Sequence, residues 1–119
     1  MKVVVIGASN KPHRYSYQAV MLLKEKGHEV YPVHRRVKEI EGIRVYPAIN
    51  DIDDFVDTVT MYVGAGVSDE LIEDIIAKNP RRIIFNPGAE NFHLEQKARE
   101  QGIITVNACT LVMLKTGQF

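Results

Sequence analysis

The sequence contains almost no cysteine and no excess of charge of either sign. With one cysteine in 119 residues, no intramolecular disulfide can form, and nothing indicates a disulfide-stabilised secreted scaffold. Fifteen basic residues balance fifteen acidic residues, and a net charge of zero disfavours proteins that bind nucleic acid by neutralising many phosphates. We therefore expect no nucleic acid among the partners, although a local basic cluster is compatible with this composition.

Long apolar runs are also absent. No stretch approaches the roughly 20 apolar residues of a membrane span, and the run that begins at Val3 is too short for a signal peptide. The histidines do not follow metal-ligand spacing, and there is no Walker A lysine, G-x-S-x-G turn or paired-carboxylate pattern. These absences predict a cytoplasmic protein without membrane attachment, without a metal and without a recognisable catalytic centre.

The sequence does contain a regular alternation of short apolar runs and amphipathic helical stretches. Strands are expected at 3–6, 29–33, 57–63, 82–85 and 103–106, and helices at 17–26, 68–78, 91–101 and 109–115. This order implies a parallel sheet with helices on both faces. We predict one domain over residues 1–119 with a three-layer, doubly wound, Rossmann-like α/β fold of about five strands in the order 3-2-1-4-5.

The predicted fold also indicates where a ligand binds. In doubly wound sheets, ligands lie beyond the carboxyl ends of the strands, at the point where the winding reverses. The predicted strand order puts this point between the first and fourth strands. We therefore expect the site between the loops that start at Gly7 and at Asn86.

Residues 7–16 form a loop with a glycine, two cations and several polar side chains. Gly7 directly follows the first strand, where a glycine lets a phosphate approach the backbone. The loop is not a dinucleotide fingerprint, because Ser9 and Pro12 replace the second and third glycines of G-x-G-x-x-G. Lys11 and Arg14 supply charge for a phosphate, and the alternative is an exposed turn with solvated charges. The predicted ligand-binding residues of this loop are Gly7, Ala8, Ser9, Asn10, Arg14, Tyr15 and Ser16.

The second strand is followed by His34, Arg35 and Arg36. An NAD enzyme usually has an acidic residue here to bind the ribose hydroxyls. Two guanidinium groups instead suit a phosphate monoester, such as the 3′-phosphate of coenzyme A or the 2′-phosphate of NADP. These three residues are predicted to bind the ligand, and NAD is disfavoured. The alternative is a solvated basic turn.

Small residues follow the third and fourth strands. Gly64 and Gly88 leave room for a ligand close to the backbone. Glu90 is a candidate hydrogen-bond acceptor, and Asn91 is a candidate helix cap. Turns that contact no ligand are the alternative. The predicted ligand-binding residues of this part of the chain are Gly64, Pro87, Gly88, Ala89, Glu90 and Asn91.

Four segments together resemble the small stand-alone CoA-binding domain proteins, which are relatives of the N-terminal CoA-binding domain of the succinyl-CoA synthetase α subunit. They are VIGAS at 5–9, RYSY at 14–17, GHEVYPV at 27–33 and NPGAEN at 86–91, the last followed by Cys109. The resemblance covers nearly the whole chain. One departure is His34-Arg35-Arg36, where family members often have Asn-Pro-Lys.

The resemblance implies that coenzyme A is the cofactor. The phosphates would lie by Gly7, Ser9 and residues 14–16, the adenosine end by residues 33–36, and the pantetheine by Gly88. The synthetase's phosphorylated histidine belongs to a second domain, so we expect a protein that binds coenzyme A or acyl-CoA without catalysing a reaction itself. A lone cysteine is usually a small buried hydrophobe, and no cation adjoins Cys109 in the sequence, so a thiol role is left open.

Two other functions remain open. An NADP-binding oxidoreductase would use the same two arginines, but it would also need a substrate site and a proton donor. An accessory subunit of a larger enzyme would leave the arginines without a role. A protein partner or a homo-oligomer is compatible with all three hypotheses, and the sequence does not identify an acyl group or a biological process.

Overall fold

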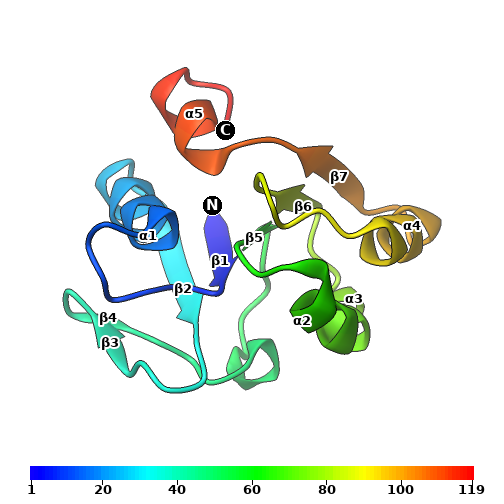
Figure 1. The fold of residues 1–119 in the computed structure, drawn as a ribbon, viewed down its shortest axis with the longest axis horizontal. Helices are drawn as coiled ribbons and strands as arrows, with labels where there is room; N and C mark the ends of the chain where they lie inside the picture. The colour runs from blue at the N-terminus through cyan, green and yellow to red at the C-terminus, as the bar shows by residue number, and fades with distance from the viewer.

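The computed structural model describes residues 1–119, and its centre is a five-stranded parallel sheet (Figure 1). The strands are β1 (Lys2–Ile6), β2 (Glu29–Val33), β5 (Thr58–Met61), β6 (Arg82–Phe85) and β7 (Ile104–Asn107). Their spatial order is β2-β1-β5-β6-β7. The predicted Rossmann-like α/β class is confirmed, with its parallel sheet of five strands.

Helices cover both faces of the sheet (Figure 1). On one face, α1 (Tyr15–Glu25) contacts α5 (Thr110–Lys115). The other face carries α2 (Ala65–Ser68), the 3₁₀ turn η2 (Asp69–Leu71), α3 (Ile72–Lys78) and α4 (Phe92–Glu100). None of these helices has the length and hydrophobicity that a membrane crossing requires.

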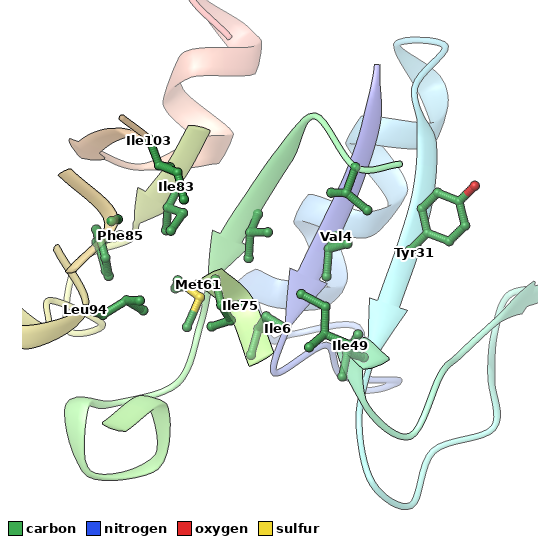
Figure 2. Close-up of a cluster of buried hydrophobic side chains, with 14 of the residues drawn as sticks. Val4, Ile6, Tyr31, Ile49, Met61, Ile75, Ile83, Phe85, Leu94 and Ile103 are labelled. Atoms are coloured by element: carbon green, nitrogen blue, oxygen red, sulfur yellow. The ribbon is translucent and has the colours of Figure 1, made fainter. Parts of the chain in front are cut away.

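The apolar residues of β1 serve both layers, because successive side chains of a strand point to opposite faces. Val3 and Val5 belong to the smaller core with Leu23 of α1. Val4 and Ile6 belong to the larger core, which Figure 2 shows together with Met61, Ile75, Phe85 and Leu94. A strand buried on both faces has to be apolar throughout, which explains the continuous β-branched run at 3–6.

The observed strand order corrects the predicted order 3-2-1-4-5. The strand predicted at 57–63 was expected outside β2, but β5 pairs with β1 on the side away from β2. The outer edge of β2 is already occupied: the Tyr46 N–H donates to the Pro32 carbonyl (2.9 Å) and the Tyr46 carbonyl accepts from the His34 N–H (3.0 Å). The next strand pairs with the other edge, at β1.

The segment 37–56 supplies this edge contact. It contains a small antiparallel hairpin of β3 (Glu39–Ile40) and β4 (Ile43–Arg44), and then the 3₁₀ turn η1 (Ile49–Asp51). The hairpin lies outside β2 in Figure 1. Ile40 packs in the core on the α1 side and Ile49 packs in the core on the opposite side, so the crossover changes faces as it passes the sheet.

With β5 beside β1, the winding reverses between these two strands. The loops that meet at the reversal are those that follow Ile6 and Met61, and β6 is one strand further away. The position expected for a ligand is therefore shifted from the loop after β6 toward the loop after β5.

A buried carboxamide ties the ends of β5 and β6 to the start of α5. Asn86 is 2% exposed. Its Nδ2 donates to Thr60 Oγ1 (2.7 Å) and to the Met61 carbonyl (2.8 Å), and its Oδ1 accepts from the Thr110 N–H (2.8 Å). The Thr60 and Thr110 hydroxyls are also hydrogen-bonded to each other (2.8 Å). Three segments distant in sequence are thereby held together at the carboxyl ends of β5 and β6.

Candidate functional site

A cavity of about 550 Å³ opens at the carboxyl ends of the central strands. Its volume lies within the range of small-molecule sites. The loop after β1, the start of α1 and the turn after β2 form most of it, and the loops after β5 and β6 complete it. The lining residues are Gly7, Ala8, Ser9, Asn10, Lys11, Arg14, Tyr15, Ser16, His34, Val37, Tyr62 and Pro87.

The loop after β1 leaves backbone donors free. The Val33 carbonyl accepts from the N–H groups of Gly7 (3.1 Å) and Ala8 (3.2 Å), which holds the start of the loop against β2. The Ser9 hydroxyl accepts from the Lys11 N–H (3.1 Å). The N–H groups of Ser9 and Asn10 have no acceptor within the protein, so they are available to an anion.

The start of α1 adds further donors at the same place. The helix begins at Tyr15, and the cap position is Arg14, whose side chain makes no capping hydrogen bond. The first-turn N–H groups of Tyr15 and Ser16 have no intrahelical acceptor. Ser16 was expected near the ligand and lies within this first turn, 6% exposed, in the cavity wall.

The cavity wall carries positive charge without compensation. Lys11 and Arg14 line it, and no aspartate or glutamate does. Neither cation forms a salt bridge within the chain. Free backbone donors, a helix start and unpaired cations are the groups with which proteins bind phosphate oxygens.

Gly7 was expected to let a phosphate approach the backbone, but its missing side chain makes room for another loop of the protein. Its φ of +85° lies in the left-handed region, and a Cβ at this position would lie 2.7 Å from Val63 Cγ1 and 3.1 Å from the Tyr62 carbonyl oxygen. The missing side chain therefore faces the loop after β5. Gly7 allows the loops of β1 and β5 to approach each other, and their approach forms the cavity.

The turn after β2 is closed by His34. Its Nδ1 accepts from the backbone N–H groups of Arg36 (3.0 Å) and Val37 (3.1 Å). His34 and Val37 line the cavity, whereas Arg35 and Arg36 are exposed and lie outside the lining. Neither arginine forms a salt bridge within the chain.

Tyr62 is a lining residue that sequence reasoning missed. It follows β5, and its hydroxyl is buried without a hydrogen-bond partner. Burial raises the pKa of this hydroxyl, so the side chain stays neutral. It was missed because residues 57–63 were expected to form one strand, whereas β5 ends at Met61 and Tyr62 begins the loop beside Gly7. Val37 was also missed, since an apolar residue within a basic turn carries no chemical signal.

The loop after β6 is mostly tied to the protein itself. Pro87 lines the cavity, but Ala89 is buried in the larger core. Asn91 is 3% exposed: its Oδ1 accepts from the Leu94 N–H (3.1 Å) and its Nδ2 donates to Ser68 Oγ (2.7 Å). The predicted residues outside the lining are Arg35, Arg36, Gly64, Gly88, Ala89, Glu90 and Asn91.

Glu90 and Gly64 occupy distinct places at this end of the sheet. The Glu90 carboxylate accepts from the Gly88 N–H (3.0 Å), so it closes its own turn. Gly64 is exposed and precedes α2, and a Cβ added there would meet no atom within 4 Å. Neither residue lines the cavity.

Comparison with known proteins points to one family. Residues 1–115 match the family described as "CoA binding domain". The chain is 39% identical over 62 residues to the α subunit of an ADP-forming acetate–CoA ligase II of Pyrococcus furiosus, and 28% identical over 102 residues to an ADP-forming acetate–CoA ligase of Methanocaldococcus jannaschii. These alignments cover 51% and 82% of this chain, but only 14% of each ligase.

The fold recurs in a solved structure of similar length. A crystal structure described as that of an uncharacterized protein superposes with a TM-score of 0.93 at 41% sequence identity. The match covers 99% of this chain and 97% of that chain. The architecture is therefore shared by a protein of nearly the same extent.

We predict that Gly7→Ala lowers the free energy of unfolding by about 1–3 kcal/mol, because alanine is strained at positive φ and its Cβ would overlap Val63. Denaturant unfolding followed by circular dichroism measures this loss. The matched control is Gly64→Ala, at φ −70° and with open space around the new methyl group, for which we expect a change within about 0.5 kcal/mol. Equal stability of the two variants would contradict the assigned role of Gly7.

Proposed function

This chain belongs to the CoA-binding domain family, and from that premise we propose that residues 1–119 act as one domain that binds coenzyme A or an acyl-CoA. The observation that carries the proposal is the cavity at the reversal of the sheet. Its wall presents free backbone N–H groups, Lys11 and Arg14, and contains no carboxylate. Such a wall favours a ligand with several phosphate oxygens.

The proposed ligand lies along the carboxyl ends of the strands. Its diphosphate contacts the N–H groups of Ser9 and Asn10 and the first turn of α1. The adenosine end lies over the turn of residues 34–37, and the pantetheine arm passes Tyr62 and Pro87 toward the loops of β5 and β6. This direction is supported by the cations, which are concentrated at the β1 and β2 loops, and by the more apolar lining at Tyr62 and Pro87.

Arg35 and Arg36 are proposed to bind the 3′-phosphate. They follow β2, at the edge of the cavity where an NAD-binding protein usually has an acidic residue. Both guanidinium groups are exposed and lack a carboxylate partner in the chain. A phosphate monoester would provide that partner with charge-assisted, bidentate hydrogen bonds.

We also propose that the chain performs no acyl transfer or redox reaction by itself. Cys109 is the one thiol, half-buried at the residue before α5. Covalent catalysis needs a base beside the nucleophile, and no histidine or carboxylate is hydrogen-bonded to this sulfur. The neighbouring Thr110 and Tyr62 side chains are neutral hydroxyls.

We predict that coenzyme A raises the melting temperature more than NADP does, and that NAD leaves it unchanged. Thermal-shift titration of the purified protein with the three ligands tests the proposed function, because a ligand at 100 times its Kd stabilises the folded state by about 2.7 kcal/mol. A larger stabilisation by NADP than by coenzyme A would favour the oxidoreductase instead.

We predict that Arg35→Ala combined with Arg36→Ala weakens binding of coenzyme A by about ten- to a hundredfold, because hydrogen bonds to charged groups contribute about 1.5–3 kcal/mol. Dephospho-CoA, which lacks the 3′-phosphate, should lose much less affinity in isothermal titration calorimetry. The control is Lys24→Ala combined with Lys26→Ala, which removes the same charge from the other end of α1. Equal losses for the two ligands would show that the arginines do not bind the 3′-phosphate.

We predict no release of free coenzyme A when the protein is incubated with acetyl-, succinyl- or longer acyl-CoA thioesters. A thiol-reactive dye follows the release against a buffer blank. Release above the blank that disappears in Cys109→Ser would make the protein a thioesterase or an acyl carrier, and would contradict the proposed absence of catalysis.

A further inference from the structure

We propose that His34 is a positioning residue that makes ligand binding depend on pH, because only its neutral imidazole can close the turn of residues 34–37. The inference rests on the proposed binding of coenzyme A and concerns the same site. Its starting point is the pair of hydrogen bonds from the Arg36 and Val37 N–H groups to His34 Nδ1, at 3.0 Å and 3.1 Å.

These two contacts determine the tautomer of the ring. A nitrogen that accepts from two N–H groups has to carry a lone pair, so Nδ1 is unprotonated and the hydrogen of the neutral ring is on Nε2. His34 lines the cavity, and its Nε2–H is therefore the group that the ring offers to a ligand oxygen. Nδ1 holds the turn while Nε2 remains a donor.

Protonation removes the closure of the turn. An imidazolium has a hydrogen on both nitrogens, and Nδ1–H would then face the N–H groups of Arg36 and Val37. The ring would have to turn away, and the backbone of residues 35–37 would lose both hydrogen bonds. Since Arg35 and Arg36 lie in this turn, the position of the backbone that carries them depends on the neutral ring.

The charged groups near His34 come from the first loop and from its own turn. Lys11 and Arg14 of the first loop line the same cavity as His34. The turn that His34 closes contains Arg35 and Arg36. The other titratable groups of the wall are Tyr15 and Tyr62, and Tyr46 contributes only its backbone carbonyl to the His34 N–H. No carboxylate lines the cavity.

The sign of the effect follows from these contacts. Acidification through the titration range of histidine opens the turn and weakens the binding of coenzyme A. The competing effect is attraction between an imidazolium and the ligand phosphates, which would strengthen binding. We expect the loss of the turn to dominate, because it affects two backbone hydrogen bonds and the placement of two arginines.

The test compares the protein with His34→Asn, since an asparagine Oδ1 can accept from the same N–H groups and does not titrate. Calorimetry with coenzyme A at about pH 7.5 and about pH 5.5 should show a loss of affinity on acidification that is about tenfold larger for the protein than for His34→Asn, as expected for two net hydrogen bonds. The variant measures the part of the loss that comes from the 3′-phosphate, which itself titrates near pH 6.

His34→Ala provides the second comparison. It lacks the acceptor at every pH, so the turn is open at pH 7.5 and its affinity for coenzyme A should already be lower than that of the unchanged protein at that pH. Its pH dependence should match that of His34→Asn. An equal acid loss in the protein and in His34→Asn would overturn the inference. So would tighter binding by the protein at low pH, or unchanged affinity of His34→Ala at pH 7.5.

NMR of the ligand-free protein separates this inference from the proposed function. A long-range ¹H–¹⁵N spectrum should show an unprotonated Nδ1 on His34 at about pH 7.5, and the amide signals of Arg36 and Val37 should follow the histidine titration in the protein but not in His34→Asn. A hydrogen on Nδ1 would overturn the turn closure even if coenzyme A binds. Confirmed closure together with no binding of coenzyme A at any pH would overturn the proposed function and the coupling to the ligand, and would leave the tautomer established.

Discussion

The buried Asn86 side chain is the contact on which the ligand-binding end of the sheet depends. It satisfies a hydroxyl and a carbonyl at the end of β5 and the first N–H of α5, while its own backbone ends β6. The Thr110 N–H has no other acceptor, and a buried N–H left without a partner costs about 1–3 kcal/mol. The network joins the end of β5, the end of β6 and the start of α5. The loops that complete the cavity follow β5 and β6.

Above this network, two close approaches form the cavity. The Val33 carbonyl accepts from Gly7 and Ala8, and this places the first loop against β2. Gly7, without a side chain, also lies against the loop after β5. With both contacts made, the N–H groups of Ser9 and Asn10 have no partner in the protein. The backbone donors for an anion therefore result from how the loop is anchored, and Lys11 and Arg14 add charge at the same place.

Much of the site could be predicted because it lies in one continuous segment. Residues 7–10 and 14–16 line the cavity as expected, since a loop that directly follows the first strand of a parallel sheet lies at its carboxyl edge. His34 and Pro87 also line it, for the same reason of position after a strand. Asn91 and Ala89 were expected at the ligand for the same reason. The Asn91 side chain instead caps α4, and Ala89 packs in the larger core. Residue type and position do not reveal whether a polar group already has a partner.

The sequence by itself determined the five sheet strands and the layers, because apolar periodicity is a local property that each strand and helix carries within its own residues. It did not determine the β3–β4 hairpin, and the helix expected at 68–78 is divided into α2, η2 and α3. Only the tertiary structure decided which strands are neighbours. The Tyr46 backbone lies on the outer edge of β2, and it comes from a segment whose irregular sequence has no periodicity. β5 pairs with the other edge, at β1, and Tyr62, directly after β5, lines the cavity. Edge occupancy is a contact between distant segments, and no local pattern encodes it.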